Sequence, residues 1–323
     1  MTVQVLKTAL KADPKDFQAN YLLGCLMRYY ERMDEAFACW EQAAKDGSKL
    51  GNLYYCLGHE YDRAKRLDEA KEMLLKAIKF EPNNPIFIRE YDKLMESQNE
   101  SAAVRLAFLK DHQSVVDMRD DTLLREIVLL NREGEYDKAL ELIGDRRFYV
   151  WEGNEVIVHD AYAEAHLERG KREMEAGKAA KARKDFEAAL LYPVNLGVGR
   201  PYRDVRCRMT HYLLGKTWAL SNKPKKAQEE YELAVADMIE PTANTRLCLA
   251  AVPYYQALAL KELGRGKEAK AILKKMEDVC KTALGGGKEE TDFFAKFAHD
   301  NGAAPKQKVF LNILKLVKEA QKA

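Results

Sequence analysis

The sequence predicts an all-α protein, a right-handed solenoid of about seven helical hairpins with a capping helix at its C-terminal end. Three observations support this prediction: a repeat of 34 residues, apolar residues at helical spacing within each half-repeat, and almost no pattern typical of β-sheet. A chain of 323 residues is long enough for one elongated array. Because a single hairpin cannot bury its own apolar face, the hairpins are expected to stack.

The repeat is clearest near the start of the chain. The stretch "ANYLLGCLMRYYERMDEAFACWEQAAKDG" aligns with "GNLYYCLGHEYDRAKRLDEAKEMLLKAIKFEPNNP", so that Gly24 falls on Gly58 and Trp40 on Leu74, each 34 residues later. Small residues let two antiparallel helices approach closely, and large residues fill the space beside them. Later stretches keep the same small-large-small order, at Ala182, Phe186 and Ala189, and at Ala227, Tyr231 and Ala234. The pattern resembles the tetratricopeptide repeat (TPR) family, which implies that a stripe of first-helix residues lines an inner groove.

The elements can be placed in order along the chain. Residues 1–16 match only the second helix of a repeat, which suggests that the chain was cut from a longer protein. An N-terminal run of repeats is expected at 17–147, divided into 17–50, 51–84, 85–118 and 119–147, with the last two degenerate. A Trp-Glu-Gly junction loop at 148–157 then leads into a second run at 158–285, which contains a long loop at 193–203. Residues 286–323 form a loop and a capping helix that covers the last repeat.

The composition argues against several classes of partner. With 53 Lys and Arg against 51 Asp and Glu, the net charge of +2 does not favour nucleic acid. No apolar run is long enough for a membrane span, so we expect a cytoplasmic protein. The six cysteines occur singly, without a Cys-x-x-Cys motif, which predicts reduced thiols and no metal. No cofactor is expected.

Tyrosines recur at one position of the first helices and give the main functional signal. Counting three residues back from the repeat Gly, or from the Ala that replaces it, gives Tyr21, Tyr55, Tyr212 and Tyr254. Tyrosine offers contact area, rigidity and a polar tip, so it is favoured in binding sites. The predicted groove residues are Tyr21, Arg28, Tyr55, His59, Tyr212, Lys216, Tyr254 and Lys261. The alternative is that these tyrosines only pack adjacent repeats. The carboxylate clamp of some co-chaperone members of the family is not matched, because Tyr21 and Cys25 stand at its places.

Two irregular loops form a second candidate site. Residues 140–235, with "RRFYVWEGNEVIVHDAYAEAHLERG" and "EAALLYPVNLGVGRP", resemble the TPR portion of large bacterial proteins that carry an upstream mutarotase-like domain of unknown function. That resemblance implies a link to carbohydrate metabolism. The candidate ligand residues in these loops are Trp151, Glu152, His159, Asn195 and Arg200.

Catalysis by this region alone is not expected. Glu152, His159, Asp160, Glu164 and His166 are suitable types for acid-base chemistry, but nothing in the sequence fixes a second group beside any of them. The two histidines lie seven apart and lack the spacing of zinc-binding helices. The sequence therefore predicts a non-enzymatic scaffold that binds a peptide, a partner protein or an upstream domain of its own chain. The alternative is an accessory part of a carbohydrate-active protein, whose loops contribute to a saccharide site.

Overall fold

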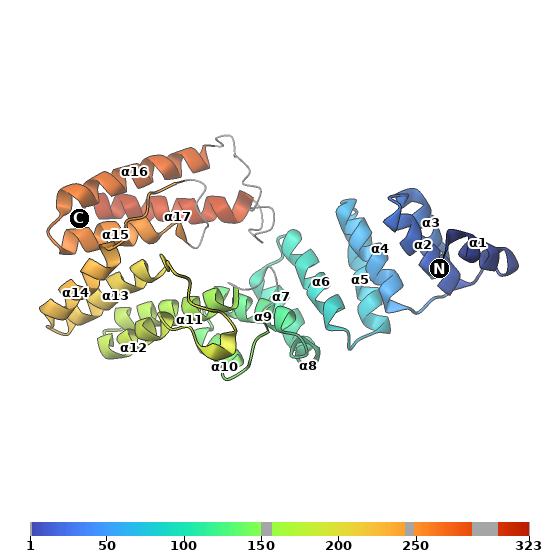
Figure 1. The fold of residues 1–323 in the computed structure, drawn as a ribbon, viewed down its shortest axis with the longest axis horizontal. Helices are drawn as coiled ribbons and strands as arrows, with labels where there is room; N and C mark the ends of the chain where they lie inside the picture. Colours follow the sequence, from blue (N-terminus) through green and yellow to red (C-terminus); the bar gives the residue numbers. More distant parts are fainter. Residues whose placement is uncertain (1, 150–156, 243–248, 286–302, 323) are drawn as a thin grey trace. The chain divides into compact units, whose positions relative to one another are not determined.

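The computed structural model describes residues 2–149, 157–242, 249–285 and 303–322, with the side chains of 303–306 left aside. Within these ranges the regular elements are helices and none is a strand, which confirms the all-α prediction (Figure 1). The chain divides into two compact units, unit 1 at Met1–Leu129 and unit 2 at Leu130–Ala323. Helix α9 (Asp120–Arg132) crosses the boundary between them. No helix in the described ranges is both long and apolar enough to cross a membrane.

Unit 1 is made of paired helices. Its elements before α9 are α1 (Val3–Ala12), α2 (Phe17–Tyr29), α3 (Met33–Lys45), α4 (Gly51–Arg63), α5 (Leu67–Phe80), α6 (Pro85–Ser97), α7 (Ala102–Asp111) and α8 (Gln113–Val116). Helices α2 and α3 form one hairpin and α4 and α5 the next, while α1 packs on α2, and α6 packs on α7 and α8. The first helices of the two hairpins, α2 and α4, carry the predicted groove residues of this unit.

Unit 2 contains three long hairpins and a final helix. After α9 its elements are α10 (Tyr136–Ile143), α11 (Ile157–Glu175), α12 (Ala179–Ala189), the 3-10 helix η1 (Val194–Leu196), α13 (Cys207–Leu220), α14 (Pro224–Val235), α15 (Val252–Glu262), α16 (Gly266–Leu284) and α17 (Ala303–Lys322). The pairs α11/α12, α13/α14 and α15/α16 pack as hairpins, and α17 packs along α16.

A glycine on the first helix marks the closest approach within the regular hairpins. A β-carbon added to Gly24 would lie 2.4 Å from the Trp40 ring, and one added to Gly215 would lie 2.3 Å from the Tyr231 ring. These distances are shorter than two non-bonded carbon atoms tolerate, so only glycine fits. The same arrangement joins Gly58 to Leu74 and Gly170 to Phe186. The large partners are all buried, as close packing of helix interiors requires.

The turns between first and second helices share one geometry. Seven of them in the described ranges contain a residue with positive φ: Glu31, Lys65, Asn99, Gly134, Gly177, Asn222 and Gly264. At the first turn the Glu31 N–H donates to the Arg28 carbonyl and the next residue's N–H donates to the Met27 carbonyl, both at 2.9 Å. This is the Schellman motif, which satisfies the last carbonyls of a helix. The other six turns repeat both bonds. The degenerate repeats therefore keep the turn although they lose the consensus residues.

The third repeat replaces the glycine contact with buried charge. Seven residues before its turn, where the regular repeats carry glycine, stands Asp92, which is fully buried. Arg105 of α7 donates to its two oxygens at 2.8 and 2.9 Å, and Arg125 of α9 donates to it as well. The same arginines bond Glu96 at 2.8 and 2.7 Å. Burial opposes ionisation of Glu96, but the two guanidinium groups lower its pKa to about 2. An ion network thus joins α6, α7 and α9.

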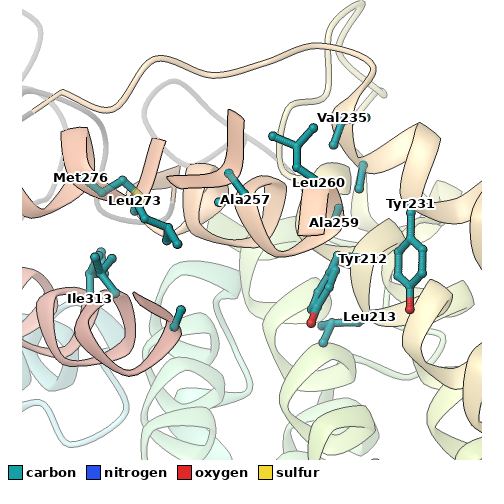
Figure 2. Packing of buried hydrophobic residues seen from close by; sticks show 14 of the residues in the cluster. Tyr212, Leu213, Tyr231, Val235, Ala257, Ala259, Leu260, Leu273, Met276 and Ile313 are labelled. Carbon is teal, nitrogen blue, oxygen red and sulfur yellow. The ribbon is translucent and has the colours of Figure 1, made fainter. Parts of the chain in front are cut away.

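Helix α17 covers the end of unit 2. Its buried side chains, Phe310, Ile313, Val317 and Ala320, belong to the same apolar cluster as α16. Figure 2 shows Ile313 facing Leu273 and Met276. The Lys261 ammonium of α15 also donates to the Ala320 carbonyl. The last hairpin therefore has its apolar face buried by a single additional helix, in the way a solenoid end requires.

Candidate functional site

Tyr21 and Tyr55 lie at equivalent places on α2 and α4, each three residues before the close-approach glycine. Both rings are half-buried and reach the surface of unit 1. The Tyr55 ring stacks on Phe87 of α6, with centroids 5.6 Å apart and planes 24° apart, and it also touches His59. Partial burial raises the pKa of each phenol, so both hydroxyl groups stay protonated and can donate hydrogen bonds.

An ion pair stands beside these rings. The Arg28 Nε donates to Glu60 Oε1 at 2.5 Å, joining α2 to α4. Glu60 is 5% exposed whereas the Arg28 side chain is 44% exposed. Burial opposes ionisation of Glu60, but the bond from Arg28 outweighs it and lowers the carboxyl pKa. Glu60 therefore stays charged and orients Arg28, whose side chain remains partly exposed. His59 Nδ1 lies 3.4 Å from the same carboxylate.

The corresponding residues of unit 2 contact other parts of their own unit. Tyr212 is 8% exposed, and its ring packs against Tyr231 and Tyr255, with centroids 5.9 and 5.8 Å away. Figure 2 shows Tyr212 and Tyr231 within the buried cluster. Lys216 Nζ bonds Glu262 at 3.0 Å. The predicted stripe thus has an accessible part in unit 1 and a largely occupied part in unit 2.

The two remaining stripe residues of unit 2 face α17. Tyr254 is half-buried beside Tyr255, with ring centroids 5.2 Å apart, and it lies close enough to Glu319 of α17 for that charge to raise its pKa further than burial alone. Lys261 is bonded to the α17 backbone, as described above. These side chains hold the capping helix.

The loop residues predicted to form a ligand site do not all lie in the described part of the chain, and those that do have different contacts. Trp151 and Glu152 lie outside the described residues. The Asn195 side-chain amide donates to the carbonyls of Gly144 and Arg146 at 3.0 and 3.1 Å, and the backbone carbonyl of Asn195 accepts from the Phe148 N–H at 2.7 Å. Asn195 therefore fastens the segment before the Trp-Glu-Gly turn to η1. Its amide N–H groups are used for this structural role.

His159 packs in the interior of unit 2. It is 2% exposed, its ring stacks on Tyr192 at 3.7 Å, and its Nε2 lies 3.0 Å from the Leu191 carbonyl. Burial lowers its pKa, so the ring is neutral at pH 7 and its Nε2–H donates to that carbonyl. The exposed Arg200 lies near enough to Tyr192 to lower the pKa of its phenol, although burial and the bond to Asp204 raise it more.

The acid-base candidates His166 and Glu164 have separate surroundings in unit 2. His166 Nδ1 lies 2.8 Å from Asp185, which Arg169 bonds as well. Glu164 lies on α11, the first helix of that hairpin, and its side chain is exposed. Neighbouring protein atoms still displace part of its hydration, which raises the pKa of its carboxyl group. Among the described residues no group of three or more His, Cys, Asp or Glu side chains is placed to hold a metal ion.

Sequence reasoning missed one cluster in unit 1. Cys25 of α2, Cys56 of α4 and Tyr21 lie near enough to one another that each changes the pKa of the others. Their separation of 31 residues differs from the repeat period, so no consensus position pairs them. The signal that could have found them is the contact between successive first helices, which joins residues 32 apart at Arg28 and Glu60.

Comparison with known proteins gives structural neighbours. No protein-family model matches the chain. The chain is similar to YrrB, "a TPR protein with an unusual peptide-binding site", at 17% identity and a TM-score of 0.43, over 58% of this chain and 92% of that one. It is also similar to a tetratricopeptide repeat protein from Parabacteroides merdae, at 16% identity and a TM-score of 0.43, over 83% of this chain and 98% of that one. A third neighbour, Naa15/Naa10 bound to HypK-THB, shows 12% identity and a TM-score of 0.47, over 99% of this chain and 55% of that one.

The chain's own features define its architecture. The 34-residue spacing, the glycine contacts and the repeated turns all come from the described helices themselves. These features make the chain an array of helical hairpins of the tetratricopeptide type.

Proposed function

We propose that the protein is a non-enzymatic interaction scaffold, and that Tyr21, Arg28, Tyr55 and His59 of unit 1 bind an extended peptide segment of a partner protein. We call these four residues the unit 1 stripe. One observation carries the proposal: the unit 1 stripe stays accessible on two successive first helices, whereas Tyr212 and Lys261 of unit 2 are engaged by their own chain.

The chemistry of the unit 1 stripe suits such a ligand. Two half-buried tyrosine rings offer flat apolar contact that costs little side-chain entropy on binding, and each has a hydroxyl for a backbone group. Arg28 is held in place by Glu60, and its side chain is 44% exposed. A guanidinium group that is already oriented loses less entropy per hydrogen bond formed. The favoured ligand therefore carries an apolar side chain next to a carbonyl or carboxylate that faces Arg28.

The test is a peptide selection followed by affinity measurement. Peptides are selected from a random displayed library on the full chain, and binding of the enriched sequence is measured by calorimetry. The paired change Tyr21→Ala and Tyr55→Ala should weaken binding by about 30-fold or more, because truncating a hot-spot residue costs about 2 kcal/mol or more. Changing both to Phe separates the contribution of the hydroxyl groups from that of the rings.

A matched control lies on the same helix. Tyr29 and Tyr30 are 78% and 55% exposed at the end of α2, so replacing both with Ala removes as many tyrosines without touching the unit 1 stripe. That variant should bind like the parent. Replacing Tyr212 and Tyr254 should lower the melting temperature and leave affinity nearly unchanged after folding is confirmed by circular dichroism. Loss of binding only in this last variant would move the site to unit 2 and contradict the proposal.

A further inference from the structure

Two basic segments of unit 2 lie side by side. Residues 178–184, "KAAKARK", stand at the start of α12, and residues 223–226, "KPKK", at the start of α14. Arg183 donates to the Ser221 hydroxyl at 2.7 Å, and its guanidinium carbon lies 3.5 Å from the centroid of the Trp218 ring on α13. Lys226 Nζ lies 4.3 Å from the centroid of the same ring. The two segments therefore form one surface without a carboxylate of its own, which we call the lysine patch: Lys178, Lys181, Arg183, Lys184, Lys223, Lys225 and Lys226.

The first turns of other helices carry an ion pair where the lysine patch carries like charges. In α12 the N-cap residue and the residue three places later are Lys178 and Lys181, and in α14 they are Lys223 and Lys226. Like charges one turn apart repel one another, and the partial positive charge of a helix N-terminus opposes cations in the first turn. These lysines therefore cost helix stability, which indicates a role other than folding. The ion pairs at the same two positions of α3, α5, α10 and α16 are Arg32 with Glu35, Arg66 with Glu69, Lys138 with Glu135, and Arg265 with Glu268.

Most of the charge on the lysine patch is exposed and unmatched. Lys178 bonds Glu173 at 3.1 Å, and Arg183 and Lys226 contact the Trp218 ring. The other four lysines are exposed and form no ion pair within the described part of the chain: Lys181, Lys184, Lys223 and Lys225. A surface of one sign attracts and orients a partner of the opposite sign.

We propose that the lysine patch is a second interaction surface of the protein, on which an Asp- and Glu-rich segment of a partner protein docks. Carboxylates of such a segment would complete at α12 and α14 the ion pairs that the other helices make within their own first turns. A single-stranded nucleic acid fits less well, because its bases need open aromatic faces for stacking. Trp218, the aromatic residue at the lysine patch, already contacts two cations and is half-buried.

The test measures binding of a fluorescent deca-glutamate peptide to the full chain by fluorescence anisotropy. The peptide should bind at about 50 mM NaCl and be released at about 0.5 M, because salt screens exposed charges. The paired change Lys181→Glu and Lys226→Glu should weaken binding by about 10-fold or more, because it places like charges against the peptide. The same variant gains an acidic residue three places after Lys178 and Lys223, so its urea midpoint should be no lower than that of the parent. Weaker binding therefore cannot be ascribed to loss of folding.

A control with the same change of net charge is Lys7→Glu with Lys11→Glu, on exposed positions of α1 in unit 1. It should bind deca-glutamate like the parent. Absence of binding by the parent, equal binding by the lysine-patch variant, or an equal loss in the α1 control would overturn the inference.

Two further probes distinguish the class of partner. If a deca-thymidylate or vesicles containing phosphatidylserine bind through the lysine patch while deca-glutamate does not, the assignment to an acidic polypeptide is wrong. The paired change Tyr21→Ala and Tyr55→Ala should leave deca-glutamate binding unchanged. The lysine patch therefore stands or fails separately from the proposed function of the unit 1 stripe.

Discussion

Replacing Asp92 with Ala should destabilise unit 1 more than most other single changes in it. Its carboxylate is fully buried and accepts three N–H groups, two from Arg105 and one from Arg125. Arg105 is itself 3% exposed, so the change leaves a buried guanidinium with Glu96 as its remaining carboxylate among these contacts. Removing one partner of a buried ion pair costs about 3–5 kcal/mol, mostly because the other charge is left without compensation. We expect the free energy of unfolding to fall by that amount.

The assay is urea unfolding followed by far-ultraviolet circular dichroism, with the unit 1 transition fitted separately because repeat arrays need not unfold in one step. The informative comparison is the double variant Asp92→Ala with Arg105→Met. A buried pair replaced by apolar residues is often neutral in stability, so the double variant should recover most of the loss. A loss below about 1 kcal/mol in the single variant, or losses that simply add in the double variant, would refute this account.

Three further changes test other features. Gly215→Ala places a methyl group against the Tyr231 ring and should cost about 1–3 kcal/mol by overpacking, measured as a lower urea midpoint and relieved by also changing Tyr231 to Leu. Lys65→Gly should raise stability by about 1 kcal/mol, because a non-glycine residue with positive φ pays that amount; an unchanged midpoint would argue against strain at this turn. Burial opposes protonation of His211, but hydrogen bonds to Cys207 and Glu230 raise its pKa to about 9. The protonated His211 therefore contributes fully to the free energy of unfolding below about pH 6.5. This contribution is lost as the pH rises through about 9. Urea unfolding at a series of pH values should show the loss in the parent and not in His211→Gln.

Periodicity was enough to predict the architecture of the regular hairpins. The spacing of Gly24 from Trp40 and of Gly58 from Leu74 reflects a steric requirement, and such requirements leave the same residue types at the same positions. The terminal helix was predictable for a similar reason, since its apolar residues recur at helical spacing and its buried ones pack on the last hairpin.

The third repeat was harder to predict because its helices meet through different chemistry. Asp92 stands where glycine is expected, and only its distant partners Arg105 and Arg125 show why a charge is stable there. Two turns also carry Glu31 and Lys65 at positive φ, where sequence rules favour glycine or asparagine. Backbone hydrogen bonds hold these turns, so the residue types at these positions do not indicate that a turn is present.

The candidate site was also predictable only in part. The register of the four tyrosines was visible in the sequence, but their accessibility depends on three-dimensional neighbours. Tyr212 is buried by aromatic residues on α14 and α15, and Tyr254 lies beside α17. Nothing in a linear repeat distinguishes these from Tyr21 and Tyr55.

The position of α17 has a consequence for self-association. An uncovered α16 would offer the surface on which a further hairpin stacks, including one from a second molecule, and such end-to-end addition would produce open filaments. Because α17 belongs to the same chain, it competes for that surface at an effective concentration on the order of millimolar. A helix from a second molecule, present at a much lower concentration, would displace α17 only if its affinity for this surface were correspondingly higher. Stacking of a second molecule on α16 would therefore first require that α17 leave this surface.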